Sequence, residues 1–282
     1  MKTVMVTGAG GYIGSHVVRE LTRRGVRVIG VDRSVGDEPG VKFVAADLFD
    51  PALDLCALVG CVPDVCLHLA WRNGFSHNNE SHMDDLSAHY RFLMELAHAG
   101  VGQIAVMGSM HEVGYWEGAI TADTPCNPQS LYGVAKNALR QALLLSFANE
   151  PVVFQWLRAF YIYGNDEKAQ SIFGKILRAD AAGDGRFPFT SGQNLYDFIT
   201  VDDLARQIAS VVLQSEISGV INCCSGEPES LAARVEGFIR DNDLSIRLEY
   251  GAFPDRPYDS PGVWGDATDI RKIMAANAIE EG

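Results

Sequence analysis

Short hydrophobic runs alternate with stretches of helical periodicity along the first half of the chain, which predicts alternating strands and helices. The short runs predict strands at residues 2–7, 26–31, 41–45, 65–70, 103–107 and 151–158. Between them we expect helices at residues 12–24, 51–59, 81–99 and from 127 or 128 to about 149. Apolar runs without strict alternation are typical of strands buried on both faces. The pattern therefore predicts an α/β fold, a doubly wound parallel sheet covered by helices.

Beyond about residue 160 the periodicity weakens. We expect a loop at 183–192, a helix at 201–214, a strand at 219–223, a helix at 230–241 and a tail rich in Pro and Gly at 253–265. The predicted organisation is a first domain over residues 1–160, to which residues 190–225 return, and a small second region over 161–282. The two are expected to be interleaved, because no linker separates them.

Composition excludes several classes of protein. With 47% hydrophobic and 21% charged residues in 282, the chain is predicted to be globular rather than disordered. A net charge of −13 argues against nucleic-acid and anionic-membrane partners. No apolar run reaches membrane-spanning length, and the first apolar run enters glycines as a buried strand does, so we expect a cytoplasmic protein with reduced cysteines. The six cysteines lack metal-ligand spacing, and no metal is expected.

Several glycines lie in the loop between the first predicted strand and the first predicted helix. Gly8, Gly11 and Gly14 follow a GxxGxxG spacing, with Tyr12 and Ile13 between the last two. Such glycines permit a tight turn, close backbone approach to a pyrophosphate, and contact between helix and strand. The helix N-terminus then offers N–H groups to phosphates. No Lys-Ser/Thr follows, so this is not a mononucleotide P-loop. The loop predicts a Rossmann dinucleotide-binding fold.

Two acidic residues after the second and third strands bear on the cofactor. Asp32 is placed to accept hydrogen bonds from the adenosine ribose and to repel a 2′-phosphate, which favours NAD over NADP. The neighbouring Arg33 carries a positive charge that would help the site to accept a 2′-phosphate. Asp47 and Leu48 either meet the adenine or form a helix cap.

A Tyr and a Lys four residues apart on a predicted helix carry the candidate chemistry. Tyr132 and Lys136 share one helix face. A nearby ammonium lowers the pKa of a phenol, which can then exchange a proton with a hydroxyl group while a hydride moves to or from the same carbon. Ser109, at the end of the fifth strand, is placed to hydrogen-bond the substrate oxygen.

Together these segments resemble the extended short-chain dehydrogenase/reductases, a family of nucleotide-sugar epimerases, dehydratases and ketoreductases. The resemblance covers nearly the whole chain. It is carried by segments TGAGGYIGSHV (7–17), HLA (68–70), GSMHEVG (108–114), TPCNPQSLYGVAK (124–136), LRAFYIYG (157–164), YDFITVDDLA (196–205), INCCSGEP (221–228) and RPYDSPGVWGDATDIRKI (256–273), with Asp32 and Asp47-Leu48.

The resemblance implies a role for each matched residue. Ser109 would polarise the sugar oxygen, Tyr132 would be the acid/base, and Lys136 would hold the nicotinamide ribose and tune Tyr132. The cofactor NAD would be held by Gly8, Gly11, Tyr12, Ile13, Gly14, Asp32, Arg33, Asp47, Leu48, Leu69, Ala70, Tyr132 and Lys136. The substrate would be met by Trp71, Ser109, Met110, Tyr161, Tyr196 and Arg256. Arg256 would clamp the substrate's diphosphate, or else be a surface cation.

Several positions depart from the family's pattern. The family's 4,6-dehydratases carry Asp-Glu where this chain has Met110 and His111, which disfavours elimination, although an offset pairing would bring Glu112 to the Glu position. His111 is either a second acid/base or a loop residue. Trp71 and Trp116 either wall the sugar site or pack in loops. Arg158 is expected to hold the strand end instead of substrate. His77 and His82 are expected to be solvated in a polar loop.

The leading expectation is an NAD(H)-dependent reductase of a nucleotide 4-keto-6-deoxyhexose at C4. A nucleotide-sugar 4-epimerase with tightly bound NAD is the alternative, and a non-catalytic dinucleotide sensor is a remote one. The family also implies a homodimer formed by the helices at 81–99 and 128–149. Leu139, Leu143 and Leu144 would lie on that surface, unless they are buried within one chain.

Overall fold

The computed structural model describes residues 2–34, 36–165, 171–254 and 259–280. A sheet of seven parallel strands forms its centre, and neighbouring strands follow the order β11-β7-β5-β4-β1-β2-β3. Their bounds in chain order are β1 (Thr3–Thr7), β2 (Arg27–Asp32), β3 (Lys42–Ala45), β4 (Val65–His68), β5 (Gln103–Ser109), β7 (Val153–Ala159) and β11 (Gly219–Cys223). The order reverses between β1 and β4, and ligands of such sheets bind beyond the carboxyl ends of the strands at that point.

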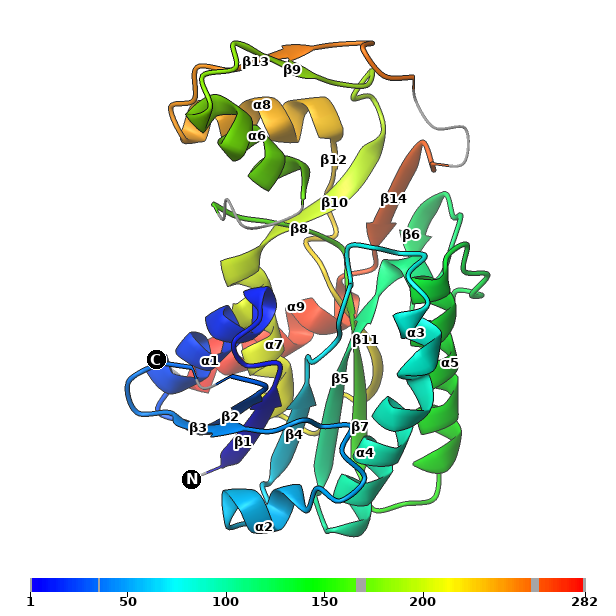
Figure 1. The fold of residues 1–282 in the computed structure, drawn as a ribbon. Helices are drawn as coiled ribbons and strands as arrows, with labels where there is room; N and C mark the ends of the chain where they lie inside the picture. Colours follow the sequence, from blue (N-terminus) through cyan, green and yellow to red (C-terminus); the bar gives the residue numbers. More distant parts are fainter. Residues whose placement is uncertain (1, 35, 166–170, 255–258, 281–282) are drawn as a thin grey trace.

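Helices cover both faces of this sheet (Figure 1). On one face lie α1 (Tyr12–Arg23), α7 (Val201–Leu213) and α9 (Thr268–Glu280), and on the other lie α4 (Leu86–His98) and α5 (Leu131–Ser146). Successive side chains of a strand point to opposite faces, so Val4 and Val6 join one core cluster and Met5 joins the other. The predicted doubly wound α/β fold is confirmed.

A smaller part of the molecule sits beyond the carboxyl ends of the parallel strands (Figure 1). It contains α6 (Ile172–Ala181), α8 (Leu231–Asp241) and the parallel pair of β9 (Arg186–Pro188) with β13 (Arg247–Glu249). A five-stranded sheet lies between the two parts. Its strands are β6 (Gly118–Ile120), β8 (Tyr161–Tyr163), β10 (Leu195–Thr200), β12 (Pro228–Ser230) and β14 (Gly262–Gly265).

Several element boundaries differ from the prediction, each for a local reason. The helix expected at 81–99 is two helices, α3 (Ser81–Asp84) and α4, which meet at Asp85. The helix expected from 127 begins at Leu131, because the Ser130 hydroxyl accepts the Gly133 N–H at 3.2 Å and caps it. Likewise α2 (Leu55–Val59) begins after Asp54 rather than at residue 51. The loop expected at 183–192 contains β9.

The described residues include no helix long and apolar enough to cross a membrane, and no group of three His, Cys, Asp or Glu side chains that could hold a metal ion. Leu139 and Leu143 are fully buried within the chain, so internal packing against α4 and the sheet accounts for both of them. Leu144 is half-buried and Leu145 is 79% exposed on the same helix.

Candidate active site

The glycine loop has the shape of a phosphate cradle. Gly8 has a φ of +70°, and a Cβ added to it would lie 2.7 Å from the Ala70 nitrogen. A Cβ on Gly14 would lie 2.0 Å from the Gly8 carbonyl oxygen. Gly11 is the N-cap of α1, and no side chain caps the helix. Because α1 follows β1 after this short loop, its N-terminus lies beyond the carboxyl end of β1, where a helix N-terminus stabilises an anion.

Asp32 closes one side of this cradle at the end of β2. Its carboxylate accepts the Gly10 N–H at 2.9 Å and the Arg33 N–H at 2.7 Å, while the Arg33 side chain is exposed. Leu69 and Ala70 pass beside Gly8, with the Leu69 N–H bonded to the Thr7 carbonyl. These residues fit a dinucleotide laid across the switch point of the sheet.

Asp47 lies beyond β3 and makes a local bond. Its carboxylate accepts the Phe49 N–H at 3.0 Å, which is the geometry of a turn cap, and Leu48 is half-buried beside it. Asp47 does not cap a helix, because the N-cap of α2 is Asp54; it caps a turn instead, and its side chain is exposed.

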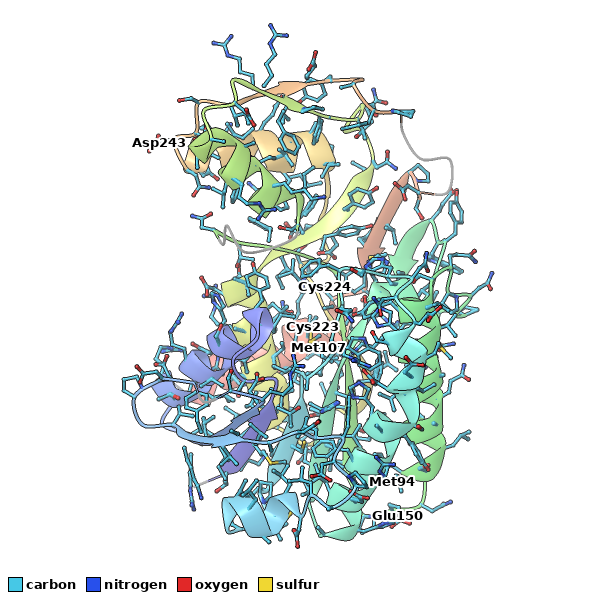
Figure 2. All side chains as sticks on the ribbon, in the orientation of Figure 1. Met94, Met107, Glu150, Cys223, Cys224 and Asp243 are labelled. Atoms are coloured by element: carbon cyan, nitrogen blue, oxygen red, sulfur yellow. The ribbon has the colours of Figure 1, made fainter. Side chains whose placement is uncertain are left out.

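The Ser, Tyr and Lys predicted from separate segments lie together. Ser109 ends β5, where its hydroxyl accepts the His111 N–H at 3.3 Å, and it lies close enough to Tyr132, on the first turn of α5, to influence that phenol. Burial raises the pKa of Tyr132 to about 12, although the Ser109 hydroxyl opposes that rise. Lys136 is 3% exposed, and its Nζ donates to the Met107 carbonyl at 2.7 Å. Figure 2 shows Met107 near the carboxyl ends of the strands, below the small part.

Burial also acts on the second member of the Tyr–Lys pair. Desolvation lowers the pKa of Lys136 to about 7, and the nearby Glu112 carboxylate opposes that shift. A lysine poised near neutral pH can change charge as a ligand enters, and its charged form is the one that favours a phenolate. The arrangement can therefore move a proton at the Tyr132 hydroxyl.

Aromatic rings and imidazoles surround this Tyr–Lys pair, and most of these side chains were not predicted as site residues. Trp71 meets the Tyr132 ring edge-on, with centroids 6.1 Å apart. Five of the seven histidines gather around these two rings. They are His68, His77, His82, His89 and His111. The expectation that His77 and His82 are solvated is wrong: His82 is 1% exposed, and His77 is half-buried, stacked 5.3 Å from Tyr132.

The loop at 71–80 explains why these histidines are buried. It folds over the start of α5, where the His77 carbonyl accepts the Tyr132 N–H at 2.8 Å and the Asn78 amide oxygen accepts the Leu131 N–H at 3.2 Å. Those N–H groups have no partner within the helix. Arg72 pairs with Asp85 at the other end of the loop. The loop thus fixes the turn that carries Tyr132.

The family model described as the NAD-dependent epimerase/dehydratase family matches residues 4–224. The chain belongs to this family. It is 43% identical over 272 residues to a dTDP-6-deoxy-L-talose 4-dehydrogenase (NAD(+)) of Aggregatibacter actinomycetemcomitans, covering 93% of this chain and 98% of that protein. It is 25% identical over 303 residues to a UDP-glucose 4-epimerase of Lactobacillus helveticus, covering 96% of this chain and 90% of that one.

Among solved structures, MoeE5 in complex with UDP-glucuronic acid and NAD is similar, with a TM-score of 0.80 and 26% identity, covering 97% of this chain and 92% of that one. Membership of the family confirms that the chain is an NAD-dependent enzyme of the extended short-chain dehydrogenase/reductase type, as the motifs indicate. The cofactor is NAD, and the glycine cradle with Asp32 has the shape to hold it.

The residues that follow Ser109 lie in two different environments. Glu112 is fully buried: one oxygen accepts Arg158 Nε at 2.6 Å, and both accept Trp156 Nε1, at 2.8 and 3.0 Å. Its carboxylate is therefore engaged in a buried ion pair, which disfavours the offset pairing with the Glu of a dehydratase. Arg158 holds the strand end through this pair, as predicted, and is itself fully buried.

His111 lies at the edge of the site. Burial and the neighbouring His77 lower the pKa of His111 to about 4, so it is a neutral imidazole near pH 7. Its ring meets His77 edge-on at 4.4 Å and lies 6.2 Å from the Tyr132 ring. A neutral imidazole there can accept or donate a hydrogen bond, and it is a weak proton donor.

The remaining candidates are those that the sequence assigns to the substrate. Tyr161 and Tyr196 pack against each other at 4.3 Å between β8 and β10. Met110 is 6% exposed and belongs to the core, which leaves little of it for substrate. Trp116 donates its indole N–H to the Ala119 carbonyl at 3.0 Å. Arg256 lies outside the described residues.

Proposed function

We propose that this protein reduces the 4-keto group of a nucleotide-activated 6-deoxyhexose with NADH, the reverse reaction being oxidation of the 4-hydroxyl with NAD. The observation that carries the proposal is the meeting of Ser109, Tyr132 and Lys136 in one buried place, where Glu112 is engaged in a buried ion pair. Such a site suits proton and hydride transfer at one carbon and lacks the Asp-Glu pair of the dehydratases. The name of the 43% identical relative, a 4-dehydrogenase, supports the same chemistry.

In the reduction, the Ser109 hydroxyl donates a hydrogen bond to the C4 oxygen and holds it beside Tyr132. When bound, NADH supplies the hydride that C4 receives. Tyr132 gives its hydroxyl proton to the same oxygen, so the ketone becomes an alcohol and a phenolate remains. The Lys136 ammonium stabilises that phenolate, which then regains a proton from solvent.

The cofactor contacts follow from the cradle. We assign the pyrophosphate to the N–H groups of the α1 turn that begins at Gly11, with Gly8 and Gly14 giving the room that a Cβ would fill. Asp32 takes the adenosine ribose, and Leu69 and Ala70 line the cofactor. His111, as a neutral imidazole, hydrogen-bonds the sugar rather than supplying the proton at C4.

Replacing Tyr132 by Phe tests the catalytic assignment. We expect turnover with a nucleotide 4-keto-6-deoxyhexose to fall by about 100- to 10,000-fold, the usual contribution of a general acid, while NADH still binds. Tyr90→Phe is the matched control, because the Tyr90 hydroxyl bonds Ser146 at 2.8 Å on the outer helices. Full turnover in the Tyr132 variant would remove Tyr132 from its proposed role.

A 4-epimerase is the second candidate, and the 25% identical UDP-glucose 4-epimerase favours it. An epimerase returns the hydride to the sugar and so keeps its NAD bound. NAD released by denaturing the purified protein, with no net consumption of added NADH, would favour the epimerase over the reductase.

A further inference from the structure

The indole of Trp71 lies between the candidate catalytic lysine and a buried histidine. On one face, Lys136 Nζ is 3.7 Å from the ring centroid. On the other face, the His89 ring stacks at 4.3 Å with an interplanar angle of 8°. The indole therefore touches the ammonium directly, and it lies nearly perpendicular to the Tyr132 ring.

Hydrogen bonds fix the orientation of this ring. Trp71 Nε1–H donates to His82 Nδ1 at 3.0 Å, and His82 Nε2 lies 3.1 Å from the Ser76 carbonyl. Because an indole N–H only donates, Nδ1 must accept, so the His82 proton sits on Nε2 and is given to Ser76. His82 is thus a neutral imidazole with both nitrogens used.

The histidine behind the indole is fixed as well. His89 Nδ1 lies 2.8 Å from His68 Nε2, and His68 Nδ1 lies 2.8 Å from the Thr7 hydroxyl. Both imidazoles are buried, and burial lowers the pKa of each, so they are neutral. A continuous series of contacts therefore runs from Thr7 through His68 and His89 to Trp71. Trp71 in turn contacts Lys136.

Lys136 needs such a support because its surroundings disfavour its charge. Its ammonium is desolvated, with one donor given to the Met107 carbonyl. The groups that face it are Glu112 from the short turn after β5, Tyr132 from its own helix, His68 from β4 and His89 from α4. Only Glu112 is an anion in this set. The negative face of an indole attracts a cation, more strongly when it is desolvated.

We propose that Trp71 is a positioning residue, which holds the Lys136 ammonium protonated and directed toward Tyr132, with His82 holding Trp71 in place. This rests on the proposed function only in that Lys136 acts on Tyr132. This positioning role of Trp71 differs from the expectation that its side chain lines the sugar site.

The first test uses the full-length chain without added nucleotide. Subtracting the emission of Trp71→Phe from that of the unmodified protein isolates the Trp71 fluorescence, which we expect to titrate with a midpoint near the Lys136 pKa of about 7. In Lys136→Met this titration should be absent. Trp264→Phe is the control for losing one of the four tryptophans, and it should leave the titration in place.

The second test is the pH profile of turnover. Trp71→Leu removes the aromatic face and keeps an apolar side chain, so the loss of kcat at high pH should move down by about one pH unit, with KM for the sugar little changed. Trp71→Phe, which keeps a weaker face, should move it less. His82→Asn keeps an acceptor near Nδ1, and it should lie closer to the unmodified protein than His82→Phe. Circular dichroism and urea midpoints check that each variant is folded.

Two results would overturn the proposal. One is a Trp71 emission that does not titrate, or that titrates equally in Lys136→Met. The other is a folded Trp71→Leu whose pH profile is unmoved while KM for the sugar rises, because that is the behaviour of a sugar-site wall. The fluorescence titration needs no substrate, so it can fail while the reductase assay succeeds, and it can succeed while no 4-keto sugar is turned over.

Discussion

Substitutions in the buried pair of Glu112 and Arg158 distinguish a structural role of Glu112 from a catalytic one. Glu112 accepts three hydrogen bonds from Arg158 and Trp156, and both members of the pair have 0% side-chain exposure. Replacing Glu112 by Gln keeps the shape and removes the charge. Arg158 is then left in the interior with no anionic partner, bonded to the Thr121 carbonyl at 2.9 Å.

The expected cost follows from that geometry. Removing one partner of a buried ion pair destabilises a protein by about 3–5 kcal/mol, because the other charge stays desolvated. For a chain of this size that corresponds to a fall in Tm of about 10 °C. Replacing both partners, with Glu112→Gln and Arg158→Met together, should recover most of the loss, since no uncompensated charge remains.

Urea unfolding followed by circular dichroism measures the four corners of this double-mutant cycle, and turnover is measured on the same samples below their melting temperatures. A structural Glu112 predicts a large loss of stability with turnover reduced by less than about tenfold, whereas a catalytic acid or base contributes about 100- to 10,000-fold. A stable Glu112→Gln protein with turnover lost to that extent would refute our reasoning and return Glu112 to a dehydratase-like role.

Three further predictions concern the cofactor and acid stability. Gly14→Ala would place a Cβ 2.0 Å from a carbonyl oxygen of the cradle, so NADH affinity measured by fluorescence should fall by more than about tenfold, whereas Gly102→Ala, with nothing within 4 Å, should bind normally. Asp32→Asn removes a ribose acceptor and the repulsion of a 2′-phosphate, so the preference of kcat/KM for NADH over NADPH should fall by at least about tenfold; an unchanged ratio would contradict the assignment of Asp32. Burial lowers the pKa of His68 to about 3, so the unfolded state binds more protons below its ordinary pKa of about 6.5. The free energy of unfolding should therefore decrease as the pH falls from about 6.5 to about 3. In His68→Asn, the urea midpoint should depend less on pH over this range. The same pH dependence in both proteins would contradict the prediction.

Local patterns in the sequence predicted the parts of the site that one segment carries by itself. The spacing of Gly8, Gly11 and Gly14 indicates a turn with no room for a Cβ. The strand and the helix that this turn joins are neighbours in the chain, so the sequence pattern is local. Tyr132 and Lys136 are one helical turn apart, so their meeting needs no tertiary information. The parallel sheet follows for the same reason, since runs of buried apolar residues define each strand.

The support around the Tyr–Lys pair comes from residues distant in sequence, and this is why it was missed. A polar loop at 71–80 predicts exposure, yet its carbonyl and amide oxygens are needed by the unpaired N–H groups at the start of α5. One signal was available: His82 and His89 are seven residues apart, and together with Leu93 and Leu96 they continue one helical stripe. That stripe predicts buried imidazoles, although it cannot name Trp71 as their neighbour.

The central claim is tested most directly by mixing the purified protein with NADH and a nucleotide 4-keto-6-deoxyhexose and following the nicotinamide absorbance. We predict that NADH is consumed in step with formation of the 4-hydroxy sugar, and that NADPH reacts more slowly. No loss of NADH, together with interconversion of C4 epimers by NAD that stays bound to the protein, would contradict it.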